Sequence, residues 1–221
     1  MNLSFGCSEL DQLIEKCGPG DITQLFGKKD IDKSILCIQA AVNCLKDDNR
    51  CIYIATGKFP TTRFKQFAGE DASDLAPRLL VSEPKNFDEH KSAIKKVAEV
   101  SDLESINLVI IDSPTDFYSA LGDVERAITL KKLLSKQLAY LIGLGRRYGF
   151  SILITNRVYE DDISGEKNIR GGKMLLDLSR YVVEVKKEGK RFRRAILRKG
   201  ESNLEGKKID FYLNDGEIYC P

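Results

Sequence analysis

Short apolar runs alternate with helical segments over most of this 221-residue chain. Strand-like runs are expected at 21–26, 51–56, 78–83, 106–112 and 150–155. The segments between them have helical periodicity, at 33–45, 61–69, 88–100 and 123–148. This alternation predicts an α/β fold with a mostly parallel central sheet flanked by helices, because parallel strands need a long crossover connection.

The chain beyond residue 180 has a different pattern. Three strand-like runs, YVVEVKK, RFRRAILRK and KKIDFYLN, are separated by turns that contain glycine. We expect these runs to form a C-terminal antiparallel extension of the same sheet. The sequence contains no Pro/Ser-rich linker, repeat or low-complexity block, so we expect residues 1–221 to form one domain.

Composition argues against several classes of protein. No apolar run approaches the ~20 residues of a membrane helix, and the start, MNLSFGCSELDQL, is unlike a signal peptide, so we expect a cytoplasmic protein without a membrane partner. The six cysteines include no C-x-x-C pair, and the chain has one histidine, which argues against a zinc site. We expect six free thiols, several of them small core residues.

Positive charge is concentrated near the C-terminus. The net charge is only +2, but residues 186–208 contain ten Lys and Arg against three Glu. Such a segment can be an anion-binding face, or a set of solvated charges that protects edge strands from aggregation. Charge alone favours the second interpretation.

The segment GKKDIDKS, Gly27–Ser34, nearly matches the phosphate-binding pattern G-x-x-x-x-G-K-[ST]. It follows a predicted strand and precedes a predicted helix, so backbone N–H groups and the helix N-terminus would surround a phosphate. Ser34 and the acid Asp112, at the end of a neighbouring strand, would hold Mg²⁺. The predicted nucleotide-binding residues are Gly27, Lys28, Lys29, Asp30, Ile31, Asp32, Lys33, Ser34 and Asp112.

Asp32 stands where this pattern has its second glycine. Two like charges 4 Å apart repel by about 4 kcal/mol at an effective dielectric constant of 20, so a carboxylate there weakens phosphate binding. Either the neighbouring lysines offset this repulsion, or Asp32 pairs with Lys33 and occupies the phosphate position. ATP with Mg²⁺ is therefore a doubtful cofactor, and the sequence leaves weak binding and no binding both open.

The order of several motifs resembles one known family. FGKKDIDKS, IYIATGKFPTTRF, LVIIDSPTDFYSAL, ILITNRV, IRGG and RRAILRK follow one another as in the core of the RecA/RadA recombinases. More narrowly, the chain resembles RadB, the short archaeal paralogue. The resemblance covers nearly the whole chain. It implies a RecA-like P-loop NTPase core without an N-terminal helical domain, ATP and DNA binding, and an accessory role in recombinational repair with feeble ATPase activity.

Three positions depart from that family's nucleotide site. Ala55 and Gly57 stand where the family has an acidic pair, whose glutamate activates the attacking water. Arg157 stands where the family has a glutamine that senses the γ-phosphate, and we count it among the nucleotide-binding residues because arginine still binds phosphate. Together with Asp32, these changes predict that hydrolysis is lost or very weak. No catalytic residue is predicted, since the glutamate position is lost at Gly57.

The resemblance also implies DNA contacts by two loops, at residues 113–122 and 159–170, and by the basic tail. The residues predicted to contact DNA phosphates are Lys167, Arg170, Lys173, Arg191, Arg193, Arg194, Arg198 and Lys199. Four acids in the second loop oppose such contacts. Side chains alternate between the two faces of a strand, so some of the tail arginines must be structural.

The sequence therefore predicts a DNA repair and recombination accessory protein. It would bind single-stranded or branched DNA and recombination or repair proteins, with weak or lost ATP hydrolysis. One alternative is an active DNA-dependent ATPase, favoured by Lys33, Ser34 and Asp112. The other is a pseudo-ATPase scaffold that binds partner proteins but not DNA.

Overall fold

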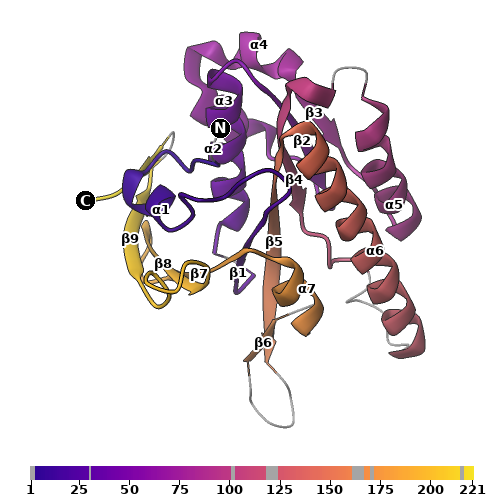
Figure 1. Cartoon of the computed structure of the whole chain (residues 1–221). Helices are drawn as coiled ribbons and strands as arrows, with labels where there is room; N and C mark the ends of the chain where they lie inside the picture. Colours follow the sequence, from indigo (N-terminus) through magenta and orange to yellow (C-terminus); the bar gives the residue numbers. More distant parts are fainter. Residues whose placement is uncertain are drawn as a thin grey trace.

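The computed structural model describes residues 3–29, 31–100, 103–117, 124–160, 167–169, 172–214 and 217–221. A β-sheet crosses the molecule, with helices on both of its faces (Figure 1). Its strands are β1 (Ile22–Gly27), β2 (Arg50–Ala55), β3 (Leu79–Ser82), β4 (Ile106–Asp112), β5 (Ser151–Glu160), β6 (Lys167–Ile169), β7 (Tyr181–Lys187), β8 (Phe192–Lys199), β9 (Lys208–Leu213) and β10 (Ile218–Tyr219). The helices are α1 (Ser8–Gln12), α2 (Lys33–Lys46), α3 (Thr61–Ala68), α4 (Ala72–Leu75), α5 (Phe87–Lys96), α6 (Val124–Tyr148) and α7 (Gly172–Leu178).

Strands β7, β1, β5, β4, β2 and β3 lie side by side in that order, and each neighbouring pair is parallel. This confirms the predicted parallel sheet. From β7 outward, β8, β9 and β10 are added in antiparallel fashion, which confirms the predicted C-terminal extension. The result places the ends of β1, β4 and β5 together at one edge of the sheet, where ligands of open α/β sheets usually bind.

The central strands of the sheet are buried on both faces, and successive residues of β4 point to opposite sides. Ile110 packs with the face covered by α2, and Val109 and Ile111 pack with the face covered by α5 and α6 (Figure 1). Burial on both sides explains why this strand reads as a continuous apolar run. A rigid central strand therefore carries Asp112 to the edge where α2 begins.

Local signals explain several helix boundaries. The side chain of Asn86 accepts a hydrogen bond from the Glu89 backbone N–H at 2.9 Å and so begins α5 at Phe87, one residue before the predicted start. Gly69 has φ of +65° and ends α3, as the sequence suggested. The structure differs from the prediction after residue 155. Strand β5 continues to Glu160 and pairs with β6, which lies within the predicted loop at 159–170. Helix α7, which was not predicted, follows β6.

The prediction of six free thiols is wrong for two of them. Cys7, before α1, and Cys220, after β10, form a disulfide with their Cα atoms 5.9 Å apart. They are 213 residues apart in sequence, and they meet because the C-terminal segment lies beside α1 (Figure 1). The remaining thiols are free and buried, as expected of small core residues: Cys17, Cys37, Cys44 and Cys51. Within the described residues, no helix has the length and apolar character needed to cross a bilayer.

Candidate nucleotide-binding site

The Gly27–Ser34 segment connects the end of β1 to the start of α2, as predicted. A glycine is required at its first position, because a Cβ on Gly27 would lie 2.4 Å from the backbone oxygen of Val185 in β7. Ile31 is buried against the core beneath α2. The loop is therefore fixed at both ends by the sheet and by the helix.

Asp32 occupies the helix N-cap position in the left-handed conformation, with φ of +59° and ψ of +31°. Its side chain makes no hydrogen bond to the helix and instead forms an ion pair with Arg193 of β8. Of the two alternatives that the sequence left open, the pairing of Asp32 with Lys33 is wrong. The carboxylate pairs instead with the planar guanidinium of Arg193, two strands away from β1 in the sheet.

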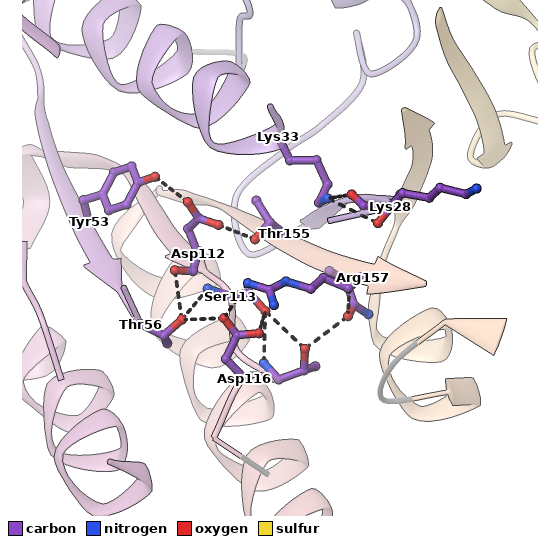
Figure 2. A network of polar contacts seen from close by, with 12 residues as sticks. Lys28, Lys33, Tyr53, Thr56, Asp112, Ser113, Asp116, Thr155 and Arg157 are labelled. Carbon is purple, nitrogen blue, oxygen red and sulfur yellow. Dashed lines mark hydrogen bonds and ion pairs between the residues drawn. The ribbon is translucent and has the colours of Figure 1, made fainter. Parts of the chain in front are cut away.

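Lys33 folds back over the loop. Its Nζ donates hydrogen bonds to the backbone oxygens of Lys28 at 2.7 Å and Gly27 at 3.2 Å (Figure 2). The residue is only 7% exposed, and burial lowers its pKa to about 8, partly opposed by the charge of Asp112. An incoming phosphate would offer this ammonium group a charged acceptor in place of two neutral carbonyls.

Asp112 is held at the end of β4 by two hydroxyl groups from neighbouring strands (Figure 2). Tyr53 of β2 donates to its Oδ2 at 2.9 Å, and Thr155 of β5 donates to its Oδ1. Burial, followed by the charge of Asp112, raises the pKa of Tyr53 well above its usual value, so the tyrosine remains a donor. The carboxylate is therefore fixed in orientation.

Arg157, which lies in β5 opposite Gly27 of β1, pairs with Asp116 in the loop after β4, at 3.3 Å (Figure 2). Thr56 donates to the same carboxylate at 3.1 Å, and the Ser113 backbone N–H donates to Thr56 Oγ1 at 3.0 Å. This network connects the ends of β2, β4 and β5. It also gives Arg157 a fixed position beside the phosphate loop.

These groups surround a cavity of about 290 Å³. Its lining includes six of the ten predicted nucleotide-binding residues: Lys29, Asp32, Lys33, Ser34, Asp112 and Arg157. Three others, Gly27, Lys28 and Ile31, line a larger neighbouring cavity of about 940 Å³. Asp30 lies outside the described residues.

Ser34 and Asp112 line the same cavity, as a Mg²⁺ site requires. A hydroxyl and a carboxylate are hard oxygen donors that suit Mg²⁺ together with water and phosphate oxygens. The residues present therefore fit this ion. The hydrogen bonds from Tyr53 and Thr155 leave lone pairs on Asp112 for such a contact.

No side chain is available at the position where the resembled family has its glutamate. Gly57 is exposed, and a Cβ added there would meet no atom within 4 Å. Ala55 is 3% exposed and packed in the core. Among the described residues at this edge, the carboxylates of Asp32, Asp112 and Asp116 all have partners.

The residues predicted to contact DNA lie in different environments. Three form ion pairs with nearby acids, in the pairs Lys173–Asp177, Arg194–Asp210 and Arg198–Glu184. Arg191 is exposed just before β8. The side chain of Lys167 and the whole of Arg170 lie outside the described residues. Exposed ion pairs contribute about 1 kcal/mol or less, so they can exchange their acid for a phosphate.

One predicted DNA contact, Arg193, is contradicted by burial, and another, Lys199, has structural partners. Arg193 is 3% exposed and is directed inward to Asp32, so its guanidinium is not available on the surface. Lys199 donates hydrogen bonds of 2.6 Å to the backbone oxygens of Leu176 and Ser179, at the C-terminal end of α7. A lysine in this position satisfies carbonyls that the helix leaves unpaired.

The sequence did not predict the residues whose hydrogen bonds hold Asp112 and Arg157 in place. They are Tyr53, Thr56, Ser113, Asp116 and Thr155. Thr56, Ser113 and Thr155 lie at or directly after the C-terminal ends of predicted parallel strands, and Tyr53 lies within one. That position was a usable signal, since such ends converge at one edge of the sheet. Asp116, four residues beyond a predicted strand end, and Arg193 had no such signal, because side-chain pairing between distant segments does not follow from spacing.

Comparison with known proteins gives a consistent result. Residues 1–214 match the Rad51 family. The DNA repair and recombination protein RadB of Methanococcoides burtonii is 33% identical over 213 residues, covering 96% of this chain and 94% of that protein. RadB of Methanoculleus marisnigri is 35% identical over 222 residues, covering 98% of this chain and 96% of that protein.

The crystal structure of the RadB recombinase superposes with a TM-score of 0.82 and covers 98% of both chains, at 22% identity. At that identity the superposition establishes a shared fold. The sequence matches extend over nearly the full length of both proteins. The chain therefore belongs to the Rad51 family of RecA-like recombinases, and within it to the RadB proteins.

Proposed function

We propose that this chain is an accessory protein of DNA repair and recombination that binds a nucleotide at Gly27–Ser34 without effective hydrolysis. It would act in the cytoplasm by binding DNA and recombination or repair proteins. Its RadB relatives are described as DNA repair and recombination proteins, which supports the role. The RecA-like arrangement of the cavity at the ends of β1, β4 and β5 supports the nucleotide.

One observation carries the loss of hydrolysis. Hydrolysis of a phosphoanhydride needs a group that positions and activates water, and Gly57 offers no side chain there. The described carboxylates at this edge are engaged by Arg193, Arg157, and the hydroxyls of Tyr53 and Thr155. A carboxylate held by a guanidinium is a poor proton acceptor.

Binding of ATP with Mg²⁺ would use the groups that remain. Lys33 would exchange its two backbone acceptors for phosphate oxygens, and Ser34 and Asp112 would hold the ion. Arg157 would lie beside the terminal phosphate. When bound, Mg²⁺ would neutralise phosphate charge and orient the phosphates.

The DNA contact in this proposal lies on the exposed part of the basic tail. Arg191 is the best candidate, with Arg194, Arg198 and Lys173 contributing if their ion pairs open. A contact of this kind depends on phosphate charge and therefore weakens steeply with salt.

The test is a titration with a fluorescent ATP analogue and Mg²⁺, run with and without single-stranded DNA, beside a turnover assay. We expect saturable binding that Lys33→Ala abolishes, with turnover at background level in both conditions. Robust DNA-stimulated turnover that Lys33→Ala removes would instead establish an active ATPase. Absence of DNA binding across a salt series would leave the protein-binding scaffold as the function.

The pKa of Lys33 gives this binding a predicted pH dependence. In the free protein its pKa is about 8, because burial disfavours the charged form. A bound phosphate stabilises the ammonium group and raises that pKa, so above pH 8 binding must be accompanied by proton uptake. We expect affinity for the analogue to be constant from pH 6.5 to 7.5 and to fall above pH 8. Constant affinity up to pH 9.5 would contradict this role of Lys33.

A further inference from the structure

Asp32 and Arg193 form a charge pair between the phosphate loop and the C-terminal sheet. They lie 161 residues apart in sequence, and Arg193 reaches Asp32 from β8, next to β7. The Arg193 side chain is 3% exposed and that of Asp32 is 39% exposed. The pair therefore has a buried cation and a carboxylate at the mouth of the phosphate cavity.

The guanidinium of Arg193 is held in place independently of Asp32. Its Nη1 donates to the backbone oxygens of Gly189 at 2.9 Å, Lys190 at 3.3 Å and Phe192 at 2.9 Å. Gly189 and Lys190 belong to the turn between β7 and β8, and Phe192 is the first residue of β8. Arg193 is thus a pre-positioned partner, and its place does not depend on a flexible surface side chain.

The backbone of Asp32 meets one requirement of the missing glycine. The left-handed conformation costs most residues energy, but Asp and Asn adopt it more readily than the rest. The backbone oxygen of Asp32 accepts from the Ile35 N–H at 2.9 Å and so begins α2 normally. The remaining difficulty with Asp at this position is its negative charge.

Arg193 removes that difficulty. Asp32 lines the phosphate cavity together with Lys29, Lys33 and Arg157. Unpaired, its carboxylate would repel a phosphate and compete for these cations. Paired with a buried guanidinium, it is neutralised locally, and Lys29 and Lys33 keep their positive charge for a phosphate, beside Arg157, which pairs with Asp116.

We propose that Arg193 is a positioning residue of the phosphate loop, which holds the Asp32 carboxylate so that aspartate can replace glycine without excluding a phosphate. The proposal rests on the proposed nucleotide binding at the same loop. It assigns the buried tail arginine a role in the nucleotide site and none in direct DNA contact.

The experiment is a double-mutant cycle with Arg193→Met and Asp32→Asn, in the full chain, read out by titration with the fluorescent ATP analogue and Mg²⁺. Asparagine keeps the shape and the left-handed conformation of aspartate and removes its charge. We expect Arg193→Met to weaken binding by at least about tenfold, and the double variant to recover most of that loss. Arg180→Met, which breaks the surface pair with Glu201, is the matched control and should leave affinity unchanged.

Thermal unfolding of the same variants separates positioning from structure. Loss of a buried arginine is expected to lower the melting temperature in both Arg193→Met and the double variant. Affinity recovered in the double variant while the melting temperature stays low would support the proposal. A double variant that binds as weakly as Arg193→Met would overturn the positioning role of Arg193, and so would an Arg193→Met variant that binds like wild type. Either result would leave the proposed nucleotide binding standing. A wild-type protein that binds no analogue would overturn both this role and the proposed nucleotide binding. If Asp32→Gly then bound the analogue, the Asp32 side chain would be identified as the group that prevents nucleotide binding.

Discussion

His90 is a buried ionisable residue outside the nucleotide site. It lies on α5, is fully buried, and neither ring nitrogen has a hydrogen-bond partner among the residues that the structure describes. The rings of Phe87 and Phe117 lie beside it, and burial lowers its pKa from 6.5 to about 4. The imidazole is therefore neutral in the folded protein at pH 7 and acts as an apolar core residue.

His90 gives a pH dependence of stability. Below pH 6.5 the unfolded chain binds a proton that the folded chain refuses, so stability falls as the pH drops from 6.5 to about 4. The loss from this residue reaches about 3 kcal/mol at pH 4. We expect His90→Leu to remove this component, so that urea unfolding shows a variant near wild type at pH 7 and more stable than wild type at pH 4. Parallel pH profiles for the two proteins would show that His90 does not titrate as described.

Gly57 provides a gain-of-function prediction at the scale of one residue. A Cβ at this position would meet no atom within 4 Å, so a side chain can begin here without a clash. We expect Gly57→Glu to raise Mg²⁺-dependent ATP turnover above the wild-type background, because a carboxylate is restored where water must be activated. Gly57→Gln is the control, since it matches the size and lacks the base. Equal turnover in the two variants would mean that Arg157 or another feature limits the reaction.

The tail strand β8 carries both structural and surface cations, and this distinction can be measured. Lys199→Met removes two hydrogen bonds to the end of α7, so we expect a loss of about 1–2 kcal/mol in urea unfolding with little change in DNA affinity. Arg191→Ala should preserve stability and reduce both DNA affinity and the salt slope, the latter by about 1. If Lys199→Met reduced DNA affinity more than Arg191→Ala did, Lys199 would be a DNA contact.

The long, strongly patterned elements were predictable from sequence, and the short ones were not. The bounds of β4 agree with the prediction because five of its seven residues are buried and the run ends at a charge. By contrast, β6 has three residues and exists through its pairing with the end of β5. The phosphate loop was found by its motif, but the direction of the Asp32 side chain depends on Arg193, which only the folded sheet brings near.

The sheet places the Gly27–Ser34 loop close to the basic C-terminal segment. Strand β1 carries the phosphate loop and pairs directly with β7, so that Phe26 lies opposite Glu184, and β7 in turn pairs with β8. Only strand β7 therefore separates β1, which carries the loop, from β8.

The Cys7–Cys220 disulfide acts on the scale of the whole chain, because it closes a loop of 213 residues. Restricting an unfolded chain of that length stabilises the fold by up to about 5 kcal/mol, and engineered or natural bonds often give less. We expect reductant to lower the urea midpoint of the wild-type protein, with a change of about 2–5 kcal/mol in unfolding free energy. The Cys7→Ser/Cys220→Ser variant should match the reduced wild type and should not respond to reductant. Since neither Cys7 nor Cys220 lines the cavity of about 290 Å³, affinity for the ATP analogue should survive reduction. Wild-type stability that is unchanged by reductant would show that the bond contributes nothing to the fold.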